Sequence, residues 1–153
     1  MKNSRSPRRR AREFAMQGLY QLLLTKGEAR EILHHLEAGE GFARADRGMF
    51  DRLWTGTVAA RADLDLMLSR YVDRAPASLS PIEHAILLIG AYELLSTPET
   101  PYRVIINEGV ELAKSFGGTD GHKYINGVLD KLAAELRQPE IAAAPARTPP
   151  RGE

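Results

Sequence analysis

The chain is 153 residues long, 43% hydrophobic, and carries a formal net charge of +1. This length suits one domain or two small lobes with a shared core, and the hydrophobic fraction excludes disorder along the whole chain. The absence of cysteine excludes disulfides, thiolate metal sites and cysteine nucleophiles, and it fits a reducing cytoplasm.

Seven helices are predicted from the helical spacing of apolar residues, and strand signals are nearly absent. In chain order the apolar stripes of the predicted helices span residues 11–23, 32–36, 50–58, 64–72, 82–94, 105–116 and 125–136, and Pro101 is expected to open the sixth helix. Ser6 and Pro7 stand where an N-cap and a first helical residue belong, and Asp63 is a candidate cap for the fourth helix. The clearest start is the capping box Ser80-Pro81-Ile82-Glu83. The helix that follows it is apolar on nearly every side, which predicts a place in the middle of a bundle.

The two ends of the chain differ in composition from this helical body. Four prolines among alanines follow Arg137, which predicts a disordered tail over residues 138–153. The sequence therefore predicts a flexible basic arm (1–12), an all-α domain of about seven helices (13–137) and that tail. No segment is apolar for the roughly 20 residues of a membrane span, and no export signal follows the N-terminal arginines, so a cytoplasmic protein is expected.

Positive charge is concentrated at the start of the chain. Six cations precede the first acidic residue, Glu13: Lys2, Arg5, Arg8, Arg9, Arg10 and Arg12. Such an arm is either a solvated terminus or an RNA-binding element. The second interpretation is favoured because guanidinium groups match phosphates bidentately and stack on bases, and because the arm runs directly into a helix.

Residues with catalytic or metal-binding potential are poorly arranged for either role. None of the histidines forms a pair at helical i, i+4 spacing: His34, His35, His84 and His122. The loop over 117–123 is glycine-rich, but a helix precedes it and Tyr124 replaces the Ser or Thr of a nucleotide-binding loop. Free backbone N–H groups, the positive end of the next helix and Lys123 still suit a nucleic-acid phosphate. We therefore expect no catalytic residue, no metal and no cofactor.

One more feature lies on the first predicted helix. At 100° per residue, Met16, Tyr20 and Leu24 fall opposite its core stripe, with Gln17 beside them. An apolar strip on this face either contacts the second lobe or binds a partner, and pairing with a second copy of the chain is open as well.

Together these segments resemble the NusB family of transcription antitermination factors. Three blocks carry the resemblance: Arg8–Glu13 with Ala15, Gln17 and Leu19–Tyr20; Pro101–Tyr102, Val104, Ile106–Glu108 and Glu111–Gly117; and His122–Asp130. The resemblance implies an all-α fold of two small lobes. It also implies binding to the boxA element of nascent ribosomal-operon RNA, together with NusE, a small-subunit ribosomal protein. The pair would join other Nus factors on RNA polymerase to suppress termination.

The resemblance also assigns roles to residues. The predicted RNA-binding residues are Arg8, Arg9, Arg10, Arg12, Gln17, Asp120, Lys123 and Tyr124. The predicted partner-binding residues are Met16, Tyr20, Leu24 and Glu83.

Two other classes of function compete with this one. Some RNA methyltransferases carry a NusB-like domain, but they need a second domain of about 200 residues with a cofactor loop. A DNA-binding regulator would need a recognition helix with clustered polar residues, which none of the predicted helices has.

Overall fold

The computed structural model describes residues 6–25, 27–73 and 79–143, and within them it contains helices and no strands. In chain order these are α1 (Pro7–Thr25), α2 (Ala29–Glu37), the short 3₁₀ turn η1 (Phe42–Arg44), α3 (Arg47–Leu68), α4 (Pro81–Ser96), α5 (Tyr102–Phe116), α6 (Gly121–Leu136) and α7 (Gln138–Ala143). The predicted all-α fold is confirmed. None of these helices is both long enough and apolar enough to span a membrane.

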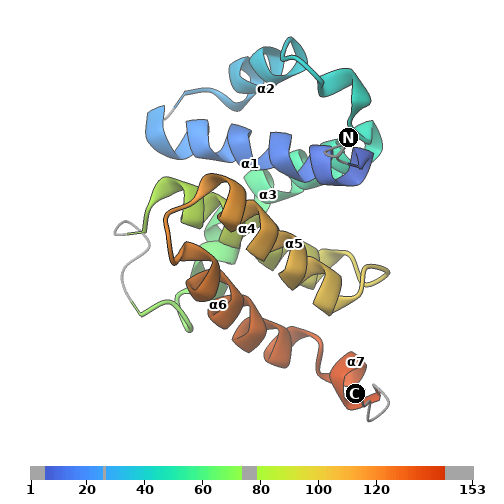
Figure 1. Cartoon of the computed structure of the whole chain (residues 1–153), viewed down its shortest axis with the longest axis vertical. Helices are drawn as coiled ribbons and strands as arrows, with labels where there is room; N and C mark the ends of the chain where they lie inside the picture. Colours follow the sequence, from blue (N-terminus) through green and yellow to red (C-terminus); the bar gives the residue numbers. More distant parts are fainter. Residues whose placement is uncertain (1–5, 26, 74–78, 144–153) are drawn as a thin grey trace.

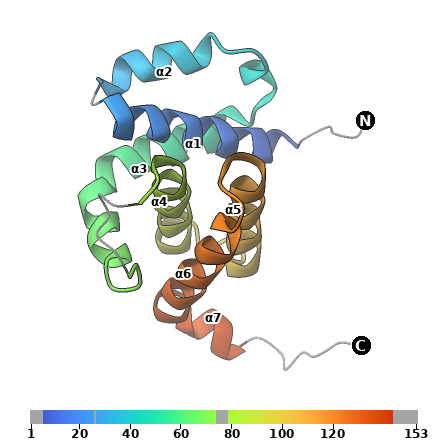
Figure 2. The same cartoon turned by 60° about the vertical axis from the view of Figure 1, so that its left-hand side comes forward.

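The helices form two groups that share one core. Helices α1 and α2 lie on one side of the molecule and α4 to α7 on the other, and α3 runs from behind α1 to a place beside α4, as Figures 1 and 2 show. Helix α1 packs against both α3 and α4, so the buried residues of both groups form a single continuous cluster. Helix α4 lies in the middle, and every residue from His84 to Ala91 is buried, as its all-round apolar sequence predicts.

The predicted helix starts are largely confirmed. The Ser6 hydroxyl accepts a hydrogen bond from the Arg9 backbone N–H at 3.0 Å, and the Ser80 hydroxyl accepts one from the Glu83 N–H at 3.1 Å. Pro7 is the first residue of α1, as predicted, so residues 7–12 of the basic arm are helical. Residues 1–5, which include Lys2 and Arg5, lie outside the described residues.

The third and fourth predicted helices are one continuous helix, α3. Asp63, predicted to cap a separate helix, is an exposed residue inside it. The segment Ala59-Ala60-Arg61-Ala62 explains the difference, because these residues favour a helix and no glycine or proline interrupts them. The cap of α3 is Asp46, whose carboxylate accepts a hydrogen bond from the Met49 N–H at 3.0 Å.

Two glycines allow neighbouring helices to approach closely. A Cβ on Gly18 of α1 would lie 2.6 Å from the Trp54 ring, and a Cβ on Gly90 of α4 would lie 2.8 Å from Leu129 of α6. Both contacts are shorter than packed atoms allow, so a larger residue would push α1 from α3 or α4 from α6. Glycine at these points therefore sets the spacing of the bundle.

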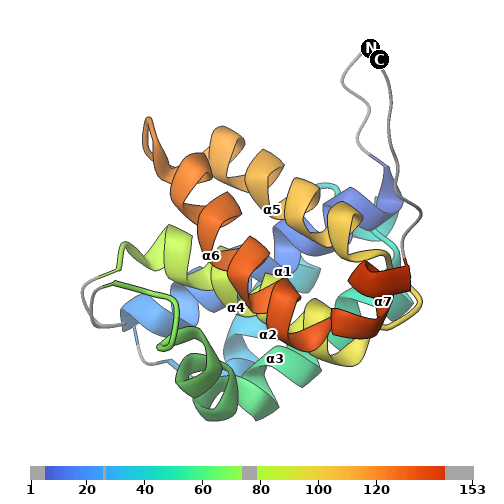
Figure 3. The ribbon, with the colours of Figure 1, turned by 90° about the horizontal axis from the view of Figure 1, so that it is seen from below.

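The start of the predicted disordered tail is ordered. Residues 138–143 form α7, which lies beside the start of α5 (Figure 3), and residues 144–153 lie outside the described part. Glu140 of α7 accepts a hydrogen bond from the Tyr102 backbone N–H at 3.0 Å, at a helix start that has no cap of its own. Burial alone would raise the pKa of Glu140, but the hydrogen bonds from Tyr102 and Arg137 outweigh it and lower that pKa.

Arg137 connects this helix to the end of α4. Its buried guanidinium donates to Glu140 at 2.5 Å and to four backbone carbonyls, those of Glu93, Leu94, Thr97 and Thr100. Carbonyls at a helix C-terminus have no partner within the helix, so Arg137 acts as the cap of α4.

A buried ion pair joins α1 to α4. The Arg12 guanidinium donates two hydrogen bonds of 2.9 Å to the two carboxylate oxygens of Glu93, and the side chains are 4% and 3% exposed. A bidentate pair of this kind is geometrically specific, and either charge would be costly to bury without the other. The pair therefore fixes α1 against the central helix.

We predict that Arg12→Ala destabilises the fold by about 3–5 kcal/mol, because it leaves the Glu93 carboxylate buried without a counter-charge. Urea unfolding followed by circular dichroism measures the change. The control is the double variant Arg12→Met, Glu93→Leu, which removes both charges and should lose much less stability. A loss below about 1 kcal/mol in Arg12→Ala would contradict this role.

Candidate nucleic-acid interface

The arginines at the start of α1 point in different directions. Arg8 is exposed and borders a small cavity beside Glu99 and Thr100 of the α4–α5 connection. Arg9 points toward α5, where its Nε and Nη2 donate to the Glu108 carboxylate at 3.1 and 3.0 Å. These hydrogen bonds raise the pKa of Arg9 above its usual value, so its charge is already matched within the protein. Arg8 is therefore more available than Arg9 to bind a phosphate.

Arg10 lies on another side of α1, next to a second cation that sequence analysis did not identify. Gly41 has a left-handed backbone (φ 87°) that turns the chain before η1. A Cβ on Gly41 would lie 3.1 Å from Arg10 Nη1 and 3.6 Å from Arg44 Nη2, so the two guanidinium groups share one small region. Nothing in the sequence near Arg44 indicates this, because the pairing depends on how the connection folds back onto α1.

Arg12 is not part of this exposed charge. The prediction that it contacts RNA is wrong in this structure, because its guanidinium is buried and bound to Glu93. Gln17 is half-buried and lies on the same face of α1 as Arg10, two turns further along.

The residues predicted around the start of α6 lie together on the surface. Asp120 and Lys123 are each 74% exposed, and their charged groups lie 3.6 Å apart. The backbone donors expected for a phosphate are partly used: the N–H groups of Gly117, Gly121 and Lys123 all donate to carbonyls of the protein. A phosphate here would depend mainly on the Lys123 side chain and on the positive end of α6.

Two aromatic rings flank this loop. Tyr124 is half-buried, packs against the core, and donates a long hydrogen bond of 3.4 Å to Asp73. It is therefore less exposed than a pure stacking platform. Phe116, the last residue of α5, is 37% exposed. Its helical spacing suggests a core residue, so sequence reasoning missed it as a ring available to a base.

The predicted partner strip on α1 is only partly exposed. Met16 is 1% exposed, so its predicted role in partner binding is wrong in this structure. The reason is that α1 is covered by α3 on one side and α4 on another, which buries more of its circumference than one stripe. Leu24 is 52% exposed and Tyr20 is half-buried, one turn before Leu24 on the same face.

Glu83 lies between the exposed end of α1, with Tyr20 and Leu24, and the loop at the start of α6. It occupies the first turn of α4, on the same side of the molecule as the end of α1 (Figures 1 and 2). Its carboxylate oxygen Oε2 lies 2.8 Å from the point where a Cβ on Gly121 would sit, so it covers the first residue of α6. A carboxylate is favoured at a helix N-terminus, which gives Glu83 a structural role besides any role in binding.

Within the described residues, no group of three His, Asp or Glu side chains could hold an ion. His84 is buried, and its Nε2 lies 2.6 Å from Asp65 Oδ1, which accounts for it as a link between α4 and α3.

The sequence is similar to a well-defined group of proteins. The model of the NusB family matches residues 9–134. The transcription antitermination protein NusB of Bordetella pertussis is 55% identical over 149 residues, which cover 95% of this chain and 97% of that protein. The NusB protein of Ralstonia nicotianae is 52% identical over 139 residues, covering 91% of this chain and 90% of that protein.

Solved structures show the same fold. NusB of T. maritima superposes with a TM-score of 0.78 at 27% identity, covering 91% of this chain and 99% of that chain. A chain from a crystal structure of NusB and NusE in complex with double-stranded RNA superposes with a TM-score of 0.73. It is 19% identical and covers 83% of this chain and 96% of that chain, so it bears on the fold alone.

Tyr124 provides a test of ring stacking against core packing. Because the ring is half-buried, we expect Tyr124→Ala to cost about 2 kcal/mol of stability, less than the loss of a fully buried aromatic residue. We also expect it to weaken single-stranded RNA binding about tenfold, since stacking contributes roughly 1–3 kcal/mol per base. Thermal unfolding and fluorescence anisotropy measure the two effects.

The matched control is Tyr124→Phe, which keeps the ring and removes the hydrogen bond to Asp73. It should bind RNA like the parent protein and lose at most about 1 kcal/mol of stability. If folded Tyr124→Ala bound RNA normally, the ring would be a packing residue only.

Proposed function

The chain belongs to the NusB family, and from that premise we propose that it is an RNA-binding transcription antitermination factor. It binds the boxA element of nascent ribosomal-operon RNA together with NusE and helps to suppress termination by RNA polymerase. The role needs no catalytic residue or cofactor, and it is performed in the cytoplasm, where RNA polymerase works. Relatives more than half identical to this chain are named transcription antitermination proteins, which supports the proposal.

The observation that carries RNA binding is the distribution of exposed cations. The chain has almost no net charge, yet the start of α1 carries the exposed Arg8 on one side and the half-buried Arg10, beside the exposed Arg44, on another. Lys123 adds an exposed charge at the start of α6, beside the half-buried ring of Tyr124. Cations contact phosphates and aromatic rings stack on bases, so these groups together fit a single strand.

The proposed surface for NusE lies at the opposite end of α1 from its arginines. Tyr20 and Leu24 present a ring and an aliphatic side chain there, and Glu83 adds a carboxylate. NusE, a ribosomal protein, is basic in this family, so a carboxylate at the contact is complementary to it. Glu83 also covers Gly121, which brings the partner surface next to the loop of Asp120 and Lys123.

The salt dependence of RNA binding tests the first part of this proposal. About four single-strand phosphate contacts predict a slope of log K against log salt near −2.8, roughly 0.7 per contact. Arg8→Ala with Arg10→Ala should flatten the slope by about 1.4, measured by fluorescence anisotropy across a salt series.

Arg30→Ala, an exposed cation on α2, is the matched control and should leave the slope unchanged. Arg9 is a poor probe, because its removal leaves the Glu108 carboxylate without its bidentate partner. An unchanged slope in the Arg8, Arg10 double variant would make these arginines solvated residues without a role in RNA binding.

Three variants separate the two roles of Glu83. Glu83→Lys should weaken NusE binding at least tenfold, because it reverses the charge at the contact. Gly121→Ala leaves every charge in place but forces the Glu83 carboxylate aside, so it should weaken NusE binding more modestly. Glu83→Gln keeps the shape without the charge and should fall between the parent protein and Glu83→Lys.

Isothermal titration with purified NusE gives the affinities, and thermal unfolding gives stability in parallel. If all three variants lost stability but bound NusE normally when folded, Glu83 would serve only the start of α6. Sedimentation of the chain alone distinguishes partner binding from self-association, because a homodimer through Tyr20 and Leu24 would compete with NusE.

A further inference from the structure

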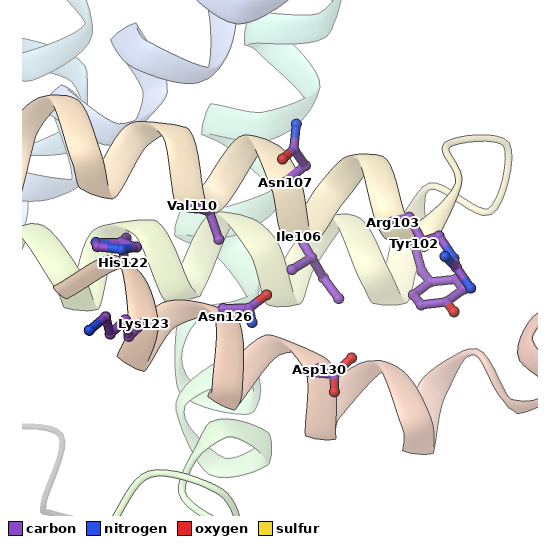
Figure 4. Close-up of a pocket in the computed structure, with 9 residues that line it drawn as sticks. All are labelled: Tyr102, Arg103, Ile106, Asn107, Val110, His122, Lys123, Asn126 and Asp130. Carbon is purple, nitrogen blue, oxygen red and sulfur yellow. The ribbon is translucent and has the colours of Figure 1, made fainter. Parts of the chain in front are cut away.

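A groove runs between α5 and α6 and shares only Lys123 with the sites described above. Its volume is about 690 Å³. Figure 4 shows Ile106 and Val110 extending from α5 toward α6, where they form an apolar floor. Asn126 rises from α6 toward α5, and Asn107 stands on the outer edge of α5.

The amides of this groove are available to a ligand. Asn107 and Asn126 are both exposed, and neither side chain makes a hydrogen bond to another described residue. An amide offers two donors and an acceptor, which match the edges of unpaired bases. An apolar floor between amides suits flat bases better than it suits phosphates, which need cations.

Cations lie at the edges of the groove, where the phosphates of a bound RNA strand would lie. Arg103 and Lys123 lie near opposite ends of the groove (Figure 4), and Asp130 is the one acidic residue among its described lining residues. The neighbouring groove between α1 and α5 has the opposite character, because among the described residues it is lined by Glu13, Glu108 and Glu111 and by one cation, Arg9. A polyanion is therefore repelled from the α1–α5 groove and accommodated along α5 and α6.

The groove also connects the two proposed RNA-contacting regions. Lys123 belongs both to the groove and to the exposed loop at the start of α6. At the other end, Tyr102 and Arg103 follow the α4–α5 connection, where Arg8 lies beside Thr100. A strand in this groove would thus leave the α6 loop and arrive near the exposed arginine of α1.

We propose that the α5–α6 groove receives unstacked bases of the bound single-stranded RNA, and that Asn126, with Asn107 at the rim, reads their edges. This inference rests on the proposed RNA-binding function and adds to it the part of the protein that distinguishes one RNA sequence from another. The exposed arginines and Lys123 supply affinity through phosphates, which is the same for every sequence. The side-chain amides of Asn126 and Asn107 supply the preference for one RNA sequence over another.

The experiment compares a 12-nucleotide boxA RNA with a scrambled RNA of the same composition, by fluorescence anisotropy of the full chain. Asn126→Ala should lower affinity for boxA about tenfold or more, within the range for one lost base contact, and change affinity for the scrambled RNA less than about twofold. Its salt slope should equal that of the parent protein, because no phosphate contact is lost. Asn107→Ala should act in the same direction but more weakly.

Gly127→Ala is the matched control. Gly127 is exposed next to Asn126, and a Cβ placed on it would meet no atom within 4 Å beyond its chain neighbours and the backbone of its own helix, so this variant should bind both RNAs normally. A second measurement uses boxA RNA carrying 4-thiouridine, whose cross-links should map to α5 and α6 around Arg103–Asn107 and Lys123–Asn126. Cross-links confined to α1 would overturn the inference.

Other outcomes are equally decisive. Equal loss for both RNAs would make Asn126 a nonspecific contact, and no loss for either would leave the groove outside the RNA site; both overturn the inference. Loss of NusE binding with RNA binding intact would assign the groove to the protein partner instead. A parent protein that binds neither RNA even with NusE present would refute the proposed function itself.

Discussion

The buried pair of Arg12 and Glu93 is the interaction on which the rest of this structure depends. Its two charges can stay in the core only while α1 and α4 keep one relative position. The backbone carbonyl of Glu93 meanwhile accepts a hydrogen bond from Arg137, which connects the same residue to the end of α6. One residue of the central helix thus fixes both the helix that carries the arginines and the helix that carries Lys123, so it sets the geometry of the proposed RNA surface.

Much of the fold could be predicted from the sequence because its signals are local. Ser6 with Pro7, and Ser80 with Pro81, mark the starts of α1 and α4 through hydrogen bonds that span three residues. Structure that depends on distant residues was harder to predict. Helix α7, which follows α6, is an example, because it is held by a backbone N–H 38 residues earlier in the chain.

The same distinction explains the outcome for the site residues. A run of arginines indicates anion binding, but it does not show that Arg12 turns inward to a carboxylate 81 residues away. Helical spacing gives one buried stripe per helix, so it misplaced Met16 on a helix that is covered from two sides. The grouping of Asp120 with Lys123 was easier to predict, since these residues lie close together in the sequence and meet across a single helical turn.

The contact between Glu140 and the first turn of α5 has a consequence for synthesis. During translation the chain emerges from its N-terminus, so the N–H of Tyr102 is made long before the carboxylate that will cap it. Until residue 140 has left the ribosome, α5 lacks that cap and α4 lacks the guanidinium of Arg137 at its end. The start of α5, which lines one side of the α5–α6 groove, is therefore among the last parts of the molecule to be completed. In a nascent chain that stalls before Glu140, this helix start would lack its cap.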